Sequence, residues 1–311
     1  MKVYKSLESL PEIKNAVVTI GTFDGVHFGH QKIIERIREI AKSKNGPSVL
    51  ITFNPHPRLV LNPSDKSLKL LTTIDERIEL LEKYGLDIVM LIPFTREFSL
   101  LPARVFIEDI LISNFNPSAI VIGYDHKFGH DRTGNIDLLK EYSRSHHFDV
   151  EEITKQTLDD IAVSSSKIRN ALNEGNVKNA SLLLGHHYAV SGFVVKGNQI
   201  GSGLGFPTAN IELNTDYKLI PANGVYAVNV YLDKLYGGML NIGHRPTFSG
   251  IHKTIEVHIF DFTKDIYGEK IKVEFLDQIR KESKFDNSDM LVGQLKKDKI
   301  KAQNIIEDLN N

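Results

Sequence analysis

The feature that most limits the fold is an alternation that runs through the first half of the chain. Short apolar runs, of the kind that form buried parallel strands, recur as AVVTI, SVLITF, DIVMLIPF and AIVIG. Between them, apolar residues recur with helical spacing in QKIIERIREIAKS, TIDERIELLEKYG, ARVFIEDILISN and NIDLLKEYSRSHH. Strands that alternate with helices predict a doubly wound α/β fold with a parallel sheet. A further helix, SSSKIRNALNEGNVKNASLLLG, is expected to close this half at Gly185.

After Gly185 the pattern changes to short, β-rich segments separated by turn residues. They are HYAVSGFVVKG, NGVYAVNVYLD, KLYGGMLNIG, TIEVHIFDF and KIKVEFLDQIR. GVYAVNVYL alternates strictly, as a half-buried antiparallel strand does. The last long helical pattern is DMLVGQLKKDKIKAQNIIEDL. We therefore predict a small antiparallel β-barrel with a C-terminal helix, and two domains, residues 1–184 and 185–311.

Composition narrows the classes of function. The formal net charge of the 311 residues is −1, so no overall field attracts nucleic acid or an anionic membrane. The lack of cysteine excludes disulfides, thiol nucleophiles and thiolate metal sites, and agrees with the reducing cytoplasm, where we expect the protein. No apolar stretch is long enough to span a membrane, and MKVYKSLESLPEIKN lacks the pattern of a signal peptide. We expect small-molecule partners, no nucleic acid and no membrane, and the oligomeric state stays open.

The stretch GTFDGVHFGH joins the first predicted strand to the first predicted helix. A helix N-terminus exposes N–H groups, glycines let backbone approach a phosphate, and imidazoles can donate to phosphate oxygens. His27 and His30 are three residues apart, which can put both rings on one side of the turn. Asp24 favours a tight turn, and Phe23 is a candidate to pack against a ligand. The alternative is an exposed turn with incidental histidines, but the strand, the glycines and the helix together favour a phosphate site.

Three further segments of the first half lie at strand ends or at a helix start. NPHP follows the second predicted strand, and Asp125 of GYDHKFG comes at the carboxyl end of another, where doubly wound sheets bind ligands. Ser165, Ser166 and Arg169 of SSSKIR start a helix, where hydroxyls, N–H groups and a guanidinium converge. Taken singly, NPHP reads as a rigid turn and the serines as helix caps. Their occurrence together favours a ligand site.

These segments together resemble the HxGH nucleotidyltransferase superfamily, specifically its flavin adenylyltransferase branch. GYDHKFG matches the family's G-x-D-x-x-F-G, and SSSKIR matches its SS[ST]-x-I-R. The resemblance implies catalysis by His27 and His30, and contacts with ATP or FMN from Gly21, Phe23, Asp24, Gly29, Asn54, His56, Asp125, Ser165, Ser166 and Arg169. The implied reaction adenylylates FMN with ATP to give FAD and pyrophosphate, which needs alignment and charge neutralisation rather than a strong base. His126 departs from the family, which often has an aromatic residue there, and so alters the expected base or flavin contacts.

The second half carries GSGLGFPTANIEL. Its glycine-rich loop, Gly197 to Gly205, can lay backbone over phosphates, although no Gly-Lys-[Ser/Thr] follows as in a Walker loop. Thr208 and Asn210 are two residues apart, so both face the same way on an extended segment. A hydroxyl and an amide oxygen suit Mg²⁺, which also takes substrate phosphates and water as ligands. On spacing alone, a magnesium site and a polar strand start are equally good interpretations.

This segment resembles riboflavin kinase, whose hallmark is G-F-P-T-A-N, and NGVYAV, NIGHRPTF, TIEVHIFDFTKDIYGE and IRKESKF agree with that family. The resemblance implies that Glu256 is the general base for the riboflavin hydroxyl, although alone it reads as a solvated strand carboxylate. Thr254, Glu256 and His258 share one strand face, and Val257 and Ile259 the face toward the barrel interior. The other implied contacts are Gly197, Gly201, Gly203, Gly205, Pro207, Asn223 and Arg280 with ATP or riboflavin, and Thr208 and Asn210 with Mg²⁺. The alternative for Arg280 is that it holds the closing helix.

The resemblance extends from about Val17 to Phe285, with all blocks in order. It implies a bifunctional enzyme that phosphorylates riboflavin to FMN in the barrel and adenylylates FMN to FAD in the α/β domain, both with ATP and Mg²⁺. Two alternatives stay open: a chain that retains one activity, for which the kinase is the better candidate, and a flavin-binding regulator without turnover. Ser202 lies where the family often has a basic residue, so Lys196 is the candidate to replace that phosphate contact.

Overall fold

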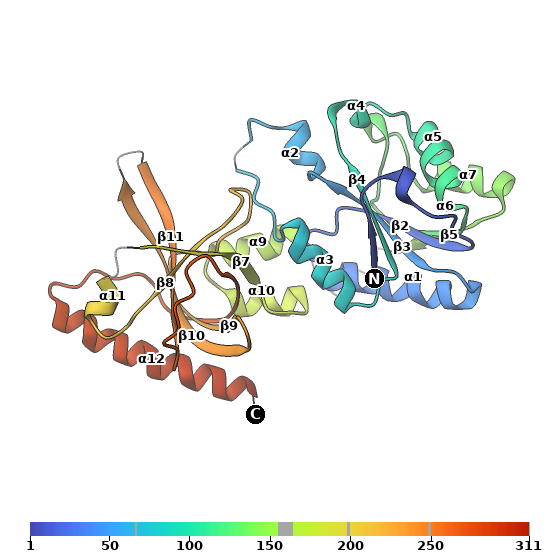
Figure 1. The fold of residues 1–311 in the computed structure, drawn as a ribbon. Helices are drawn as coiled ribbons and strands as arrows, with labels where there is room; N and C mark the ends of the chain where they lie inside the picture. The colour runs from blue at the N-terminus through green and yellow to red at the C-terminus, as the bar shows by residue number, and fades with distance from the viewer. Residues whose placement is uncertain (66, 155–163, 198–199, 248–249, 311) are drawn as a thin grey trace. The chain divides into compact units, whose positions relative to one another are not determined.

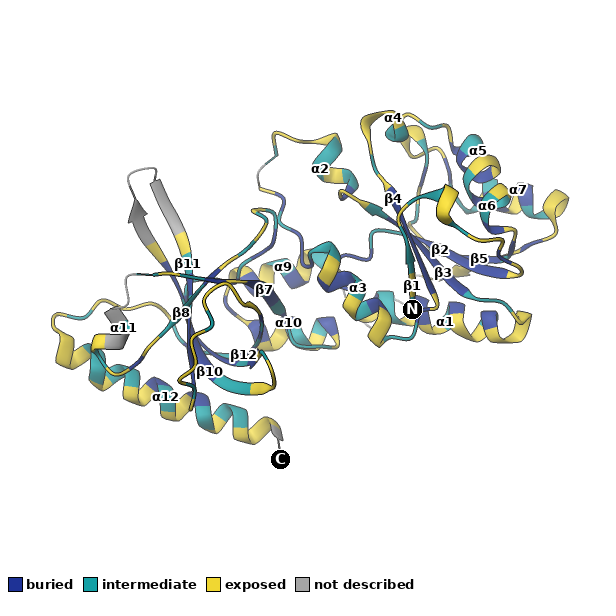
Figure 2. Cartoon of the chain, in the orientation of Figure 1, coloured by how far each residue is buried: buried dark blue, intermediate teal, exposed yellow. Residues whose placement is uncertain are grey.

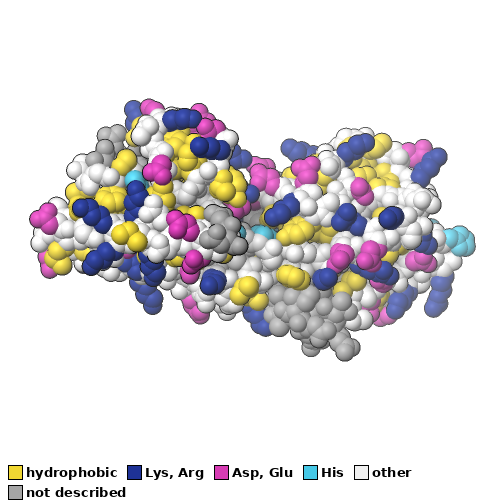
Figure 3. Space-filling view, turned by 90° about the horizontal axis from the view of Figure 1, so that it is seen from below, with side chains coloured by type: hydrophobic (Ala, Val, Ile, Leu, Met, Phe, Trp, Pro, Cys, Tyr) yellow, Lys and Arg dark blue, Asp and Glu magenta, His cyan; other side chains and the backbone are white. Residues whose placement is uncertain are grey.

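The computed structural model describes residues 1–65, 67–154, 164–197, 200–247 and 250–310, apart from the side chains of 200, 202, 245–247, 250–252 and 310. The chain forms two compact units, Met1–Ser165 and Ser166–Asn311 (Figure 1). The second unit thus begins before residue 185, where the sequence predicts the second domain to start. Within the described ranges, every helix is too short or too polar to cross a bilayer. On the face shown in Figure 3, basic and acidic side chains are interspersed over the described residues.

A six-stranded parallel sheet forms the centre of the first unit, in the order β1-β4-β3-β2-β5-β6. Its strands are β1 (Lys2–Tyr4), β2 (Ala16–Ile20), β3 (Ser48–Asn54), β4 (Ile88–Pro93), β5 (Pro117–Gly123) and β6 (Asp149–Ile153). This confirms the predicted parallel α/β fold, and the four apolar runs form β2 to β5. The two edge strands were not predicted, because β1 is short and β6, DVEEI, is only partly buried and lacks an apolar run.

Helices cover both faces of this sheet. They are α1 (Phe28–Lys44), α2 (Pro57–Leu61), α3 (Ile74–Lys83), α4 (Arg96–Ser99), α5 (Ala103–Val105), α6 (Ser113–Phe115) and α7 (Ile136–His146), with 3₁₀ turns at Leu7–Ser9 and His130–Arg132 and a π-helical segment at Phe106–Ile112. On one face, Ile34 of α1 packs in a core cluster with Val17 of β2. On the other, Phe106 and Leu139 pack in a cluster with Val18. Figure 2 shows the central strands as the buried layer of this unit.

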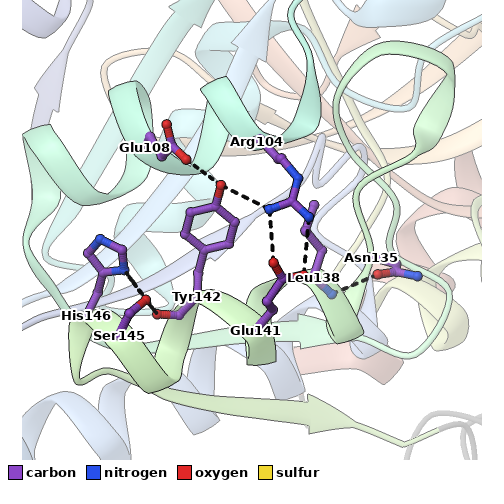
Figure 4. Close-up of polar contacts among 8 residues, drawn as sticks. All are labelled: Arg104, Glu108, Asn135, Leu138, Glu141, Tyr142, Ser145 and His146. Atoms are coloured by element: carbon purple, nitrogen blue, oxygen red, sulfur yellow. Dashed lines mark hydrogen bonds and ion pairs between the residues drawn. The ribbon is translucent and has the colours of Figure 1, made fainter.

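Polar contacts fasten α7 to the helical segment that contains α5 (Figure 4). The Tyr142 hydroxyl of α7 donates to the carboxylate of Glu108, and Arg104 pairs with Glu141 at 3.0 Å. The side chain of Asn135 caps the start of α7. The sequence predicts one helix over ARVFIEDILISN, and the structure forms α5, the π-helical segment and α6 in direct succession there. Because none of these side chains belongs to a predicted motif, the cluster supports the fold rather than the site.

Two helices open the second unit where the sequence predicts one. They are α9 (Ser165–Asn173) and α10 (Val177–Leu184). The prediction of a single helix is wrong because Gly175 takes a left-handed conformation, φ 81°, and the side chain of Asn176 caps a new helix by accepting from Asn179 N–H at 3.1 Å. The end of α9 is bonded to the loop before β9, since Ala222 N–H donates to the Leu172 carbonyl at 2.9 Å.

A closed six-stranded antiparallel barrel forms the rest of this unit, in the order β10-β11-β8-β7-β12-β9, which confirms the predicted barrel. Its elements are β7 (Ala189–Val195), α11 (Ile200–Gly203), β8 (Ala209–Glu212), β9 (Gly224–Tyr231), β10 (Leu235–Thr247), β11 (Gly250–Ile259), β12 (Lys270–Arg280) and α12 (Ser288–Asn310). The predicted C-terminal helix, α12, packs on the barrel, where Ala302 joins a core cluster with Val225, Ala227 and Met239. Figure 1 shows α12 in red beside the strands.

Candidate functional site

Three predicted motifs of the first unit follow three neighbouring strands. GTFDGVHFGH follows β2, NPHP begins with Asn54 at the end of β3, and GYDHKFG begins with Gly123 at the end of β5. Strand β2 pairs with β3 on one side and with β5 on the other. Because β3 and β4 extend the sheet from one side of β2 and β5 and β6 from the other, the strand order reverses between β2 and β5. Open α/β sheets bind ligands outside the carboxyl ends of strands at such a reversal.

The turn after β2 presents two imidazoles at the start of α1. His27 occupies the N-cap position and makes no side-chain capping bond, so it leaves the first-turn N–H groups of α1 for other acceptors. The rings of His27 and His30 stack with centroids 3.7 Å apart, and Phe23 stacks on His30 at 4.5 Å. Phe23 is itself 2% exposed, so it supports the imidazole from within the core. Gly21 is required beside it, because a methyl group there would come within 2.9 Å of the Phe23 ring.

His30 is held in its neutral form. Burial, and then the neighbouring His27 and Arg77, keep the pKa of His30 well below its usual range. Its Nδ1 atom is buried and has no hydrogen-bond partner within the part of the chain that the structure describes. A neutral imidazole offers one N–H and no positive charge. The charge that balances phosphates at this turn must therefore come from the helix start, from other residues or from a cation.

The carboxylate of Asp24 anchors the turn to backbone outside it. It is 3% exposed and accepts hydrogen bonds from the backbone N–H groups of Leu71 and Thr72, each at 3.0 Å. Asp24 therefore has a structural task, and contact between its side chain and ATP or FMN stays a prediction.

The remaining first-half candidates differ in exposure. Asn54 and Asp125 are exposed at the ends of β3 and β5. His56 is 9% exposed, and its Nδ1 accepts from Arg58 N–H at 3.2 Å, so it caps α2. Ser165, Ser166 and Arg169 lie in the first turns of α9, as predicted. Their contacts with nucleotide stay a prediction.

In the barrel, the PTAN segment runs beside the strand that carries Glu256. Asn210 of β8 pairs directly with Glu256 of β11, and the Thr208 hydroxyl lies 3.5 Å from Glu256 Oε2. His258, two residues further along β11, bonds through Nδ1 to the Pro207 carbonyl at 2.8 Å. The structure thus brings together the predicted base and both predicted magnesium ligands. Val257 and Ile259, on the other strand face, are buried as expected.

The glycine-rich loop lies close to these residues. A methyl group on Gly197 would come within 2.1 Å of Asn210 Nδ2, and one on Gly201 within 2.4 Å of the Phe206 carbonyl oxygen. Gly205 has φ 80°, which favours glycine, whereas Gly203 has open space around its Cα among the described atoms. Two of these glycines are therefore needed for a close approach and one for its backbone conformation.

A cavity of about 440 Å³ opens beside Thr208. It is lined by Val194, Pro207, Thr208, Ala209, Val257, Ile259 and the segment Phe262, Thr263, Lys264, Asp265, Ile266 and Tyr267. Lys196, the candidate substitute for a basic residue at Ser202, has its Nζ 5.9 Å from the centre of the Tyr267 ring. The segment from Phe262 to Tyr267 belongs to the block TIEVHIFDFTKDIYGE that resembles riboflavin kinase, but the sequence analysis predicted no ligand contact there, because the segment has no strand or helix period.

Asn223 directly precedes β9, and Arg280 ends β12 and pairs with Val225 of β9. Asn223 Nδ2 donates to Glu282 Oε2 at 3.1 Å. Arg280 Nε donates to both carboxylate oxygens of Asp298 on α12, at 2.9 and 3.2 Å. The structure thus supports the alternative in which Arg280 holds the closing helix, and its contact with riboflavin stays a prediction. From Arg245 onward, the NIGHRPTF side chains lie outside the described residues.

Comparison with known proteins agrees with this division. The FAD synthetase family model matches residues 10–167, and the riboflavin kinase family model matches residues 184–306. A curated relative from Buchnera aphidicola subsp. Schizaphis graminum, named bifunctional riboflavin kinase/FMN adenylyltransferase, is 41% identical over 304 residues, 96% of each chain. This chain belongs to that bifunctional family. Relatives of the same name from Listeria monocytogenes and Escherichia coli K12 are 38% and 36% identical, over 91% and 97% of this chain and 90% and 97% of theirs.

A solved structure shares the whole fold of this family member. It is described as a macrolide-efflux protein from Streptococcus pneumoniae, and it matches with a TM-score of 0.87 and 35% identity over 97% of this chain and 98% of its own. That description belongs to the Streptococcus protein, whereas the family models and the curated relatives agree on flavin enzymes.

The barrel residues fit a magnesium ion that binds together with the phosphates of the substrate. Within the described residues, no three acidic or histidine side chains converge on a metal position. The Thr208 hydroxyl and the Asn210 amide oxygen offer hard oxygen donors instead, and the Glu256 carboxylate lies nearby as the predicted base. Such a set suits Mg²⁺ that arrives with phosphate oxygens and water as its other ligands.

Proposed function

We propose that this bifunctional family member divides its two reactions between the barrel, which phosphorylates riboflavin, and the first unit, which adenylylates the resulting FMN. The observation that carries this division is the Glu256 carboxylate beside the Thr208 hydroxyl, at 3.5 Å. An alcohol such as riboflavin needs a proton acceptor to attack a phosphate well, whereas the phosphate of FMN is already an anion. The HxGH turn offers imidazoles and helix N–H groups but no comparable carboxylate, because Asp24 is buried and bonded to backbone.

In the barrel, Glu256 takes the proton of the riboflavin 5′-hydroxyl as the hydroxyl oxygen bonds to the γ-phosphorus of ATP and ADP leaves. Thr208 and Asn210 would hold the magnesium ion of ATP, and the base lies in reach on the paired strand. The ion would lower the repulsion between the phosphates and the attacking oxygen. The glycine loop from Gly197 packs backbone close to Asn210 and covers the phosphates.

The cavity beside Thr208 is proposed to take the adenine of ATP. It has the size of a small-molecule pocket and an apolar lining from Val194, Val257 and Ile259. A flat base fits such a lining, and Tyr267 with Lys196 above it closes one side.

In the first unit, a phosphate oxygen of FMN attacks the α-phosphorus of ATP, and pyrophosphate leaves as the bond to the β-phosphate breaks. His27 and His30 donate to the phosphate oxygens, and the N–H groups in the first turn of α1 add positive potential. Within the first unit, the further contacts that we propose are Gly21, Gly29, Asn54, His56, Asp125 and Ser165. The catalytic regions 1–184 and 185–311 and the cytoplasmic location also stay proposals.

The test follows products from riboflavin, ATP and Mg²⁺ over time, for the wild type and two single variants. Glu256→Gln should lower FMN formation by about 10²- to 10⁴-fold, the range for removing a general base, and leave FMN-to-FAD conversion unchanged. His30→Ala should lower FAD formation and leave FMN formation unchanged. If Glu256→Gln keeps full kinase turnover, or if His30→Ala slows both steps equally, the division fails. FMN accumulation without FAD in the wild type would favour a single-activity kinase, and binding without either product would favour a regulator.

A further inference from the structure

The turn that presents His27 and His30 has a strained backbone. Phe23 and Val26 have φ values of 48° and 39°, in the left-handed region that side chains rarely adopt, and Val26 is β-branched. Each such residue costs on the order of 1–3 kcal/mol and persists only where the surrounding structure holds it. Contacts from outside the turn must therefore fix the place of both imidazoles.

One residue from outside the turn closes the network beneath it. The Thr72 hydroxyl donates to Asp24 Oδ1 at 3.1 Å and accepts from the backbone N–H of Gly25 at 3.1 Å. Asp24 also accepts from the N–H groups of Leu71 and Thr72. Asp24 and Thr72 are 3% and 4% exposed, so water cannot easily replace these bonds.

Thr72 is itself fixed by helix α3. Thr73, the next residue, forms a capping box with Glu76 at the start of α3. Arg77, one turn further and 2% exposed, directs its Nε to the Thr72 hydroxyl at 3.4 Å. The capped helix α3 therefore fixes the position of the Thr72 hydroxyl. The hydroxyl then fixes the loop that carries His27 and His30.

We propose that Thr72 is a positioning residue for adenylyl transfer, whose hydroxyl holds the strained turn so that His27, His30 and the start of α1 face the reacting phosphates. This inference rests on the proposed function of the first unit. It adds a residue that lies outside the predicted motifs and, in the structure, acts through Asp24 and Gly25. Without the hydroxyl, the bond from the buried Gly25 N–H would be lost, and the left-handed residues would lose part of their support.

The test compares Thr72→Val, which keeps the shape and removes the hydroxyl, with Thr72→Ser, which restores the hydroxyl. Both FMN-to-FAD and riboflavin-to-FMN turnover are measured, because the barrel reaction is an internal control. Thr72→Val should lower kcat for FAD formation by about 10- to 100-fold, with KM for FMN and ATP within about threefold. Thr72→Ser should stay within about threefold of the wild type in both constants, and FMN formation should be unchanged in both variants.

A second readout separates displacement of the turn from partial unfolding of the first unit. Partial unfolding would lower kcat only by the fraction of unfolded enzyme, which circular dichroism measures at each pH. His30 faces His27 of the same turn and Arg77 of α3. A displaced turn would let water reach His30, so the pKa of His30 should rise toward its usual value. The pH at which kcat falls on the acid side should then rise as well. The matched control is Thr95→Val, which removes a hydroxyl that accepts from Phe98 N–H at 3.1 Å outside the motifs, and which should change neither reaction.

The inference is overturned if Thr72→Val keeps kcat for FAD formation within threefold of the wild type, if only KM rises, or if the pH dependence stays fixed while kcat falls. It is also overturned if Thr72→Ser is as slow as Thr72→Val. A wild type that forms no FAD at all would instead refute the proposed function, so the two failures can be told apart.

Discussion

The ion pair between Arg280 and Asp298 predicts a large loss of stability when only one partner is removed. The Asp298 side chain is 1% exposed and accepts from Arg280 Nε at 2.9 and 3.2 Å and from Gln294 Nε2 at 2.8 Å. Among the described residues, Arg280→Met leaves the buried carboxylate only the Gln294 bond, which costs about 3–5 kcal/mol. A domain is typically stable by about 5–15 kcal/mol, so the barrel unit should lose a large share of its free energy of unfolding.

A double variant shows whether the cost comes from the unpaired charge. Replacing both partners, as in Arg280→Met with Asp298→Leu, should bring the free energy of unfolding back to within about 1 kcal/mol of the wild type, because a buried pair and an apolar pair are often equivalent. The control is Lys264→Met, which breaks the exposed pair with Asp233 at 2.7 Å and should leave the free energy of unfolding close to that of the wild type.

The assay is urea unfolding followed by far-UV circular dichroism, with hydrogen exchange of α12 to assign the transition to the barrel unit, and with KM for riboflavin measured in parallel. A loss below 1 kcal/mol in Arg280→Met, together with a tenfold higher KM for riboflavin, would refute the ion-pair reasoning. It would return Arg280 to the riboflavin site that the sequence analysis predicted.

Two further predictions concern the loop and the acid stability. Gly197→Ala should lower kinase kcat/KM for ATP by about tenfold, because the added methyl lies 2.1 Å from Asn210 Nδ2 and must displace a proposed magnesium ligand. The control is Gly293→Ala, which has open space among the described atoms and should have no effect. Kinetics at varied Mg²⁺ check this, and equal values for both variants would contradict it. Burial lowers the pKa of His126 to about 4. Between pH 6.5 and 4, the unfolded chain therefore binds a proton that the folded chain does not. The free energy of unfolding should fall by about 3 kcal/mol as the pH decreases across this window. His126→Phe should reduce that slope in urea unfolding at each pH, and an unchanged slope would assign the acid loss to other groups.

The parts of the fold that followed from the sequence are those with strong local signals. AVVTI forms β2 as predicted, because a strand buried on both faces is a nearly continuous apolar run. DVEEI did not reveal β6, since an edge strand can be polar and still pair with its neighbour. The break at Gly175 and Asn176 did have a signal, a glycine followed by a capping residue, but the helical period on both sides of it concealed the boundary.

The candidate site divides in the same way. Motifs that follow strands could be placed, because parallel topology brings strand ends together, and Glu256 could be paired with the PTAN segment through a matching family pattern. Thr72 could not be found, because its partner Asp24 is 48 positions away and only the folded chain joins them. Arg280 was predicted to contact a ligand because its partner, Asp298, comes close to it only when α12 packs on the barrel.

Helix α9 has a consequence for how such a protein could evolve. It begins with the serines and the arginine assigned to adenylyl transfer, yet Leu172 at its other end is buried and bonded to Ala222 of the kinase unit. A gene split before this helix would leave one product without part of its proposed nucleotide contacts. A split after α10 would separate α10 from β12, against which it packs, and expose the apolar face of α10 to solvent. Separation into two genes would therefore require compensating mutations in the product that lost contacts of these helices. This favours keeping the two activities in one reading frame.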